Sequence, residues 1–340
     1  MPYRSSALAA TALLVATASP ALAQDLTPFT FATNWYPQAE HGGYYQAVAD
    51  GTYEACGLDV TIEPGGPQVN GRAQLIAGRI DAYMGGNLLQ SFSAVREGIP
   101  SLVVAAHFQK EPQVVMSHPG EGLDTFEDLT EASTYIIGDN GFQSFFRWMA
   151  SEYGFDTAKR QPYTFNPAAF IADPKSVQQG YLTSELYAIA SEGGFEPNVF
   201  LLADYGFDTY ATTVEMMAPF VEENPEAVQC FVDGSAIGWT NYLYGDNAAA
   251  NALIQEANPE MTDEQLAYSR EKLIEYGIVD SGEATEDGIG AMTAERIEGF
   301  YRTMVDTGVI EDDIDVAEVY TLDFVNKGVG LEEKAALGAE

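Results

Sequence analysis

The sequence predicts an α/β protein with two lobes, the second inserted within the first, and a mostly helical C-terminal part. Strand-like runs alternate with helical runs over residues 29–205, which is typical of mainly parallel sheets covered by helices on both faces. The chain has 340 residues, more than one hydrophobic core usually accommodates. Hydrophobic residues make up 46% of it, which is enough for two packed cores.

The first lobe begins with short apolar or alternating runs that are separated by helical patterns. FTFAT and LDVTIE alternate as half-buried strands do, and Gly57, Gly78 and Gly98 follow the helical runs, where helices commonly end. The predicted strands are 29–33, 58–63, 79–84 and 101–108, and the predicted helices are 42–55, 69–77 and 88–96.

The second lobe begins after Pro112. Its predicted strands are 114–117, 135–138, 162–165 and 200–203, and its predicted helices are 125–129, 141–153 and 174–180, the last leading into 181–185. From Glu215 onward the pattern is mostly helical, over 218–245, 246–257, 262–276, 291–307 and 315–321. We therefore expect one lobe of residues 24–108 and 206–340 and another of residues 109–205, with chain crossings near 109 and 205–214.

The first 23 residues predict a secretory signal peptide. Arg4 precedes a short apolar run over 7–18, Pro20 breaks the run, and Ala21-Leu22-Ala23 is an A-x-A cleavage site. The run is too short for a membrane-spanning helix, which needs about 20 apolar residues. No cysteine stands at the cleavage point, so a lipid anchor is not indicated. From the signal peptide we expect export to the periplasm, and we expect the protein to be a monomer there.

Charge and cysteine content narrow the function further. The formal net charge is −36, which disfavours binding to nucleic acid and to anionic lipid. Cys56 and Cys230 stand too far apart in the sequence to predict a disulfide, and we expect none. No Cys/His cluster indicates a metal site. The sequence has no GxSxG, P-loop, GxGxxG or HExxH motif, so we expect no enzyme, no catalytic residue and no cofactor.

A ligand site is expected where the carboxyl ends of the strands meet, because open α/β sheets bind ligands there. Two lobes that face each other with these ends form a cleft that closes on a small molecule. The residues at the predicted strand ends are Asn34, Trp35, Tyr36, Gly86, Asn87, Phe108, Gly141, Phe142, Gln143, Ser144, Tyr181 and Glu185.

Residues 34–47, NWYPQAEHGGYYQA, resemble the NMT1/THI5-like family, and so do GLDV at 57–60, LIAGRIDA at 75–82 and GIP at 98–100. The resemblance is specific over about 30–109 and weak beyond about 245. It implies a type II periplasmic-binding-protein fold. The family contains a pyrimidine synthase and a set of transport receptors. Gly86 and Gln90 stand where the synthase keeps its lysine and its sacrificial histidine, so the resemblance favours the receptors.

Each candidate residue of the first lobe can be interpreted either as a ligand contact or as a structural residue. Trp35 and Tyr36 are suited to stacking on a flat ring, but core packing is the commoner fate of a tryptophan. Glu40 and His41 open a helix, where they either contact the ligand or cap the helix. Asn34 is a candidate polar contact.

In the second lobe the resemblance implies that Glu185 lies in the receptors' glutamate-bearing loop. A carboxylate there accepts hydrogen bonds from a protonated ring nitrogen and from the neighbouring exocyclic amine. Tyr181 and Tyr210 are candidates for the opposite stacking face, although Tyr210 is equally suited to hinge packing. Free N–H groups at 141–144 are suited to an oxygen of the ligand. For Gly86 and Asn87, tight-turn chemistry and a backbone contact to the ligand both remain open.

Taken with the resemblance, these residues predict the binding component of an ABC importer that passes its ligand to an inner-membrane permease. The expected ligand is a thiamin pyrimidine precursor, either hydroxymethylpyrimidine or its formylamino-aminomethyl relative. Flavin and other aromatic vitamins remain open as ligands. The alternatives are a receptor for alkanesulfonate, taurine or nitrate and, third, a synthase-like enzyme.

Overall fold

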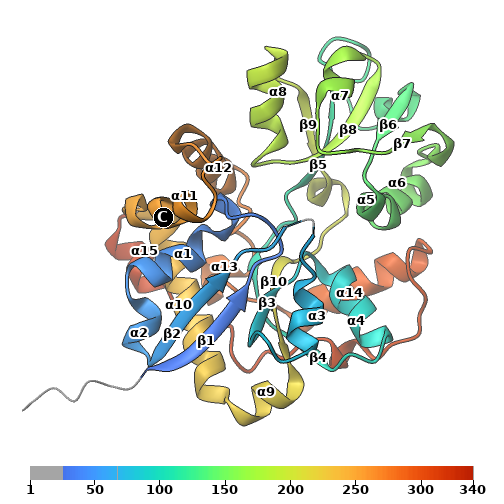
Figure 1. Cartoon of the computed structure of the whole chain (residues 1–340). Helices are drawn as coiled ribbons and strands as arrows, with labels where there is room; N and C mark the ends of the chain where they lie inside the picture. The colour runs from blue at the N-terminus through green and yellow to red at the C-terminus, as the bar shows by residue number, and fades with distance from the viewer. Residues whose placement is uncertain (1–25, 67, 340) are drawn as a thin grey trace, which may run out of the picture.

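The computed structural model describes residues 26–66 and 68–339, and the expected signal peptide lies outside them. Two five-stranded sheets form the cores of two lobes (Figure 1). The order of the first sheet is β2-β1-β3-β10-β4, from β1 (Thr27–Ala32), β2 (Leu58–Glu63), β3 (Ala82–Met84), β4 (Ser101–Phe108) and β10 (Ala211–Met217). The order of the second is β7-β6-β8-β5-β9, from β5 (Gln113–Ser117), β6 (Thr134–Ile136), β7 (Arg160–Gln161), β8 (Ser176–Tyr181) and β9 (Asn198–Leu201).

Each sheet is parallel except for one strand that runs against its neighbours. β10 pairs antiparallel with both β3 and β4, and β5 pairs antiparallel with both β8 and β9. The chain leaves the first sheet after β4, builds the whole second sheet and returns as β10. The second lobe is thus inserted within the first.

Helices cover both faces of the first sheet (Figure 1). One face carries α1 (Gly42–Ala49), α2 (Thr52–Ala55) and α10 (Pro225–Tyr244), and the other carries α3 (Gly71–Ile76), α4 (Leu88–Arg96) and α14 (Ala294–Asp306). Phe29 of β1 stacks on Phe231 of α10 with ring centroids 4.8 Å apart. On the opposite face Phe92 of α4 meets Phe300 of α14. The remaining helices of the C-terminal part are α9 (Ala218–Glu223), α11 (Ala248–Ala257), α12 (Asp263–Glu275), α13 (Ala284–Asp287) and α15 (Leu331–Ala336).

The second sheet is flanked by α5 (Asp139–Gln143), α6 (Phe145–Tyr153), α7 (Ala168–Ala172) and α8 (Glu185–Gly193). No helix in the described part of the chain combines the length and the apolar character needed to cross a membrane.

Several predicted elements are corrected by the structure. The expected helix over 174–180 is wrong, because residues 176–181 form β8, which lies between β6 and β5. The expected strand over 162–165 is a loop, since β7 ends at Gln161. The expected helix over 42–55 breaks at Gly51, whose φ is 70°, and that over 141–153 breaks at Ser144. The sequence did not predict β10 at all.

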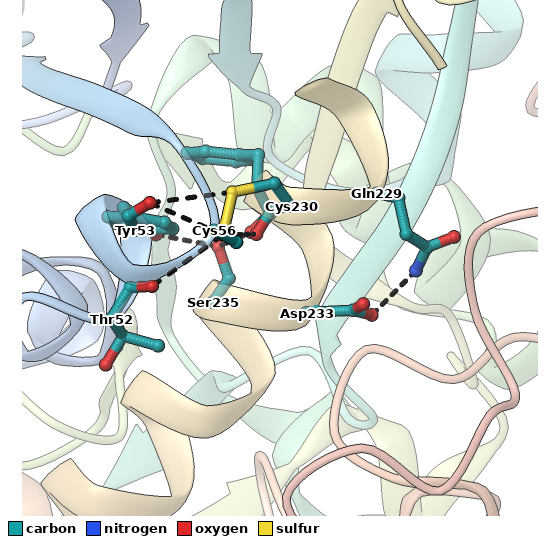
Figure 2. Close-up of a disulfide and its surroundings, with 8 residues drawn as sticks. Thr52, Tyr53, Cys56, Gln229, Cys230, Asp233 and Ser235 are labelled. Carbon is teal, nitrogen blue, oxygen red and sulfur yellow. Dashed lines mark hydrogen bonds between the residues drawn. A yellow bond between two sulfur atoms is a disulfide. The ribbon is translucent and has the colours of Figure 1, made fainter. Parts of the chain in front are cut away.

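Cys56 and Cys230 form a disulfide, contrary to our expectation. Cys56 directly follows α2 and Cys230 lies in α10, with Cα atoms 5.7 Å apart (Figure 2). Packing of α1 and α2 against α10 brings the two cysteines together although 174 residues separate them in the sequence.

The two segments that cross between the lobes are tied to α14 by one side chain. The Arg296 guanidinium donates to the backbone oxygen of Gln109 on the first crossing and to Asp208 Oδ1, at 2.5 Å, on the second. It also lies 4.3 Å from the ring centroid of Tyr210. Both crossings are therefore held at the same point of the first lobe.

Candidate functional site

Aromatic side chains from both lobes meet where β1 and β7 end. Trp35 follows β1, Phe165 follows β7, and their ring centroids lie 5.4 Å apart at an interplanar angle of 42°. Tyr36 contacts Trp35, and Tyr163 contacts Phe165. We call these four residues the interlobe aromatic cluster. The two halves of the cluster therefore come from different lobes, so a hinge movement that separates the lobes would also separate the rings.

Two members of the interlobe aromatic cluster are unusually open to solvent. Tyr36 is 50% exposed and Phe165 is 63% exposed, whereas most large aromatic side chains of this chain lie in the core. Phe165 also adopts a left-handed backbone with φ of 59°, which is uncommon for a residue with a bulky side chain. Exposed aromatic surface and local backbone strain are both features that binding sites concentrate.

Three glutamates lie around the loop that follows β8, and one of them, Glu185, contacts Tyr163 of the aromatic cluster. Glu40 precedes α1, Glu111 lies on the first crossing segment, and Glu185 begins α8. Tyr181 donates to Glu111 through its hydroxyl and to Glu185 through its N–H, and Glu40 accepts from Thr183 two residues further on. We call them the interlobe acid cluster. No salt bridge in the described part of the chain involves any of them.

Glu185 is held by hydrogen bonds from its own lobe. Its Oε1 accepts from the Tyr163 hydroxyl at 3.2 Å. Its Oε2 accepts from the Tyr181 N–H at 2.8 Å and from the Ser184 hydroxyl at 2.7 Å. The carboxylate therefore connects the loop after β8 with the aromatic cluster, and a ligand donor would have to share or displace one of these contacts.

Glu40 connects the lobes directly. Its side chain is almost completely buried and accepts a hydrogen bond from the Thr183 hydroxyl of the second lobe. Burial raises the pKa of Glu40 to about 7, against the opposing effect of that hydrogen bond. A buried carboxyl with a raised pKa favours the folded state while it is protonated.

Replacing Glu40 with glutamine is expected to stabilise the protein at pH 8 but not at pH 5. Burial raises the pKa of Glu40 above its ordinary value of 4.5, so its favourable contribution is complete below pH 4.5 and is lost as the pH rises towards 7. Glutamine removes the cost of the buried charge at pH 8, which is about 3 kcal/mol. Thermal unfolding of both proteins between pH 5 and pH 8 measures the effect.

The control for this prediction is Glu222→Gln in α9, where the carboxylate is exposed. Its Tm should follow that of the unmodified protein at every pH. An advantage of Glu40→Gln that is equal at pH 5 and pH 8 would show that the buried charge is not its cause.

The loop after β3 is organised by its own hydrogen bonds. Asn34 Nδ2 donates to the Gly85 oxygen at 3.2 Å, the Gly86 N–H donates to Gln90 Oε1, and Asn87 caps α4 by accepting from the Leu89 N–H. A Cβ on Gly86 would lie 2.7 Å from the Gln90 amide. These residues lie next to the interlobe site, but their contacts serve to fix the loop.

Of residues 141–144, three make contacts within the second lobe and one is exposed to solvent. Gly141 is buried, and a Cβ there would lie 2.6 Å from the Phe145 ring. Phe142 packs against the Arg160 guanidinium, which lies 5.1 Å from its ring centroid. The Ser144 hydroxyl donates to the Asn140 oxygen. Gln143 is exposed.

Three predicted site residues are placed in the core instead. Phe108 is fully buried against Trp239, with ring centroids 5.6 Å apart. Tyr210 is fully buried, and its hydroxyl accepts from the Thr293 N–H. His41 is buried immediately before α1, where its Nδ1 accepts from the Gln38 N–H and burial lowers its pKa to about 3. None of the three side chains is open to a ligand in this structure.

Sequence reasoning missed Tyr163, Phe165 and Glu111. The two aromatic residues were assigned to a strand that ends before them, and a correct end at Gln161 would have placed them at a strand end with Trp35. No sequence pattern marks Glu111 as a site residue. It meets Tyr181 only because the segment between β4 and β5 passes from one lobe to the other beside β8. Among the described residues, no group of His, Cys, Asp and Glu side chains is arranged to hold a metal ion.

Comparison with known proteins identifies the family. The model described as NMT1/THI5 like matches residues 38–248. Riboflavin-binding protein RibY of Chloroflexus aurantiacus is 27% identical over 332 residues, covering 95% of this chain and 92% of that protein.

Solved structures of binding proteins share the fold. The aliphatic sulphonate-binding protein SsuA of Escherichia coli superposes with a TM-score of 0.60 at 13% identity, covering 86% of this chain and 91% of that one. The nitrate-binding protein NrtA of Synechocystis gives a TM-score of 0.56 at 13% identity, covering 93% and 90%. The likeness confirms the expected two-lobed periplasmic-binding-protein fold. With the family model matching well over half of its length, the chain belongs to the NMT1/THI5-like family.

Proposed function

We propose that this protein is the substrate-binding component of an ABC-type importer and that it binds a planar, uncharged aromatic heterocycle of the riboflavin class. The observation that carries the proposal is the pairing of Trp35 and Phe165 across the two lobes, 5.4 Å apart, with Tyr36 and Tyr163 beside them. Rings presented from opposing lobes enclose a flat ligand when the lobes close, and stacking adds to burial.

The interlobe acid cluster supports a neutral ligand that is rich in hydrogen-bond donors. Carboxylates accept hydrogen bonds from N–H and O–H groups, and riboflavin offers a ring N–H and the hydroxyls of its ribityl chain. A sulfonate or nitrate would meet three acidic side chains that no basic side chain neutralises in the described residues, on a chain with a net charge of −36. The 27% identity to a riboflavin-binding protein, over nearly the whole chain, supports the same choice.

The aminopyrimidine expected from the sequence is the second candidate, favoured by the position of Glu185 beside the aromatic cluster. Both oxygens of Glu185 already accept hydrogen bonds from Tyr163, Tyr181 and Ser184. A two-point contact with an aminopyrimidine would have to replace some of them. This is why we place the flavin first.

The proposal extends to location and mode of action. The Cys56–Cys230 disulfide supports export to the periplasm after cleavage of residues 1–23, because disulfides persist in oxidising compartments. Gly86 and Gln90 at the synthase's lysine and histidine positions support binding without chemistry. In this proposal the protein is a monomer that delivers its ligand to an inner-membrane permease.

Titration calorimetry with riboflavin tests the proposal. We expect Trp35→Ala to weaken binding by about 30-fold or more, because a buried aromatic anchor contributes roughly 2 kcal/mol or more. Phe165→Ala should weaken it by about tenfold. FMN, whose phosphate adds negative charge, should bind at least about tenfold more weakly than riboflavin.

Leu337→Ala is the matched control, since it removes an exposed apolar side chain from the C-terminal segment. Its affinity for riboflavin should equal that of the unmodified protein. Binding of hydroxymethylpyrimidine in preference to riboflavin would transfer the proposal to the second candidate. Tight binding of sulfonate or nitrate would overturn it.

A further inference from the structure

Glu111 carries an oxygen that the rest of the protein does not use. The side chain lies on the crossing segment between β4 and β5 and is only 5% exposed. Its Oε1 accepts a hydrogen bond from the Tyr181 hydroxyl at 3.0 Å. Its Oε2 is buried and has no hydrogen-bond partner among the described residues. An unsatisfied buried carboxylate oxygen costs free energy, and such groups commonly receive a partner from a ligand or from water.

The surroundings of Glu111 restrict the kind of partner. Burial raises the pKa of Glu111 to about 7, against the opposing effects of the Asn87 side chain and of the hydrogen bond from Tyr181. Two further acids lie in the same region, since Glu185 accepts from the Tyr181 N–H and Glu40 accepts from the Thr183 hydroxyl. With no basic side chain paired to these acids in the described residues, an oxyanion brought to Oε2 would be repelled. A neutral N–H or O–H donor would instead complete the hydrogen bonding.

We propose that Glu111 is a specificity-determining residue of the interlobe site, whose Oε2 accepts a hydrogen bond from an N–H or O–H group of the bound heterocycle. The inference rests on the proposed function. A glutamate suits this task better than a glutamine, because it accepts from Tyr181 and from the ligand at the same time. A glutamine that accepted from Tyr181 would turn its NH₂ group towards the ligand donor.

The position of Glu111 links ligand recognition to closure. It lies on a segment that crosses between the lobes, and Tyr181 holds it from the second lobe. A ligand that donates to Oε2 therefore binds the crossing segment itself. The aromatic cluster, by contrast, contacts the ligand from positions within the two lobes. Donor position on the ligand, and not ring size alone, then decides which heterocycles are retained.

Three probes and two proteins test the proposal by calorimetry. The probes are riboflavin, N3-methylriboflavin, which lacks the ring N–H, and lumiflavin, which lacks the ribityl hydroxyls. Glu111→Gln should weaken riboflavin binding by about 10- to 100-fold, since hydrogen bonds to charged groups contribute roughly 1.5–3 kcal/mol. One of the two analogues lacks the group that donates to Oε2. That analogue should bind the unmodified protein more weakly than riboflavin does, and Glu111→Gln should reduce its affinity little further. Glu222→Gln, which alters an exposed acid in α9, should change none of the affinities.

The outcomes separate the inference from the function on which it rests. Equal riboflavin affinity of Glu111→Gln and the unmodified protein would overturn the role of Glu111 and leave the proposed function standing. So would equal affinity of the unmodified protein for all three probes. If Glu111→Gln does not fold, Glu111→Asp, which withdraws the carboxylate by one methylene, must show the same selective loss. Failure of the unmodified protein to bind riboflavin at all would overturn the flavin ligand and this inference together.

Discussion

Reducing the Cys56–Cys230 disulfide should lower the free energy of unfolding by about 3–5 kcal/mol, the largest effect we expect from a single bond in this chain. The bridge closes a loop with a sequence separation of 174, and long loops restrict the unfolded chain most. For a protein of this size the loss corresponds to a fall in Tm of about 5–8 °C. Thermal unfolding with and without a thiol reductant measures it.

The double variant Cys56→Ser, Cys230→Ser is the control for this prediction. It should unfold at the Tm of the reduced protein and show no further fall when reductant is added. A reductant-sensitive Tm in the double variant would show that the reductant acts elsewhere. An unchanged Tm in the reduced protein would show that packing of α2 against α10 suffices without the bond.

Gly238→Ala should destabilise the first lobe by about 3 kcal/mol or more. Gly238 lies where α10 crosses α1, and a Cβ there would be 2.2 Å from the backbone oxygen of Gly43. A backbone atom cannot turn aside as a flexible side chain does, so the helices must separate. Urea unfolding at neutral pH measures the loss, and reduced ligand affinity is expected to accompany it because α1 begins two residues after Glu40.

Gly299→Ala offers a matched control within another helix. Gly299 lies in α14, and a Cβ there would meet nothing within 4 Å. Alanine has the better helix propensity, so this variant should be about 0.5–1 kcal/mol more stable than the unmodified protein. If Gly238→Ala matched this gain, the close crossing of α1 and α10 would not be a constraint on the fold.

Local patterns in the sequence predicted most helices and strands. They failed where contacts with residues distant in the sequence determine the secondary structure. β4 and α4 lie within the predicted bounds because apolar runs and a capping Asn87 define them locally. β10 was missed because Glu215 interrupts its apolar character. In the structure Glu215 is fully buried and paired with Arg72 at 2.7 Å, a partner 143 residues away. β8 was taken for a helix because its glutamines do not alternate as strand residues usually do.

The positions of the candidate site residues were likewise predictable only where the local sequence determines them. Trp35 was chosen because it follows a predicted strand, and Glu185 because its loop resembles the receptors' glutamate-bearing loop. The structure places them beside Phe165 and Tyr163 respectively. Phe108 also ends a strand, yet it points into the core against Trp239. Which face a terminal side chain takes depends on the helices packed there, and no local pattern contains that information.

The order of strands in the first sheet has a consequence for biosynthesis. β4 pairs with β10, and β10 emerges from the ribosome only after the entire second lobe has been made. At typical rates of synthesis this delay is on the order of ten seconds. During that time the nascent chain presents SLVVAAHF without its neighbour, as an apolar edge able to pair with other chains. Chaperones that bind extended apolar segments are therefore expected to occupy residues 101–108 of the unfinished polypeptide.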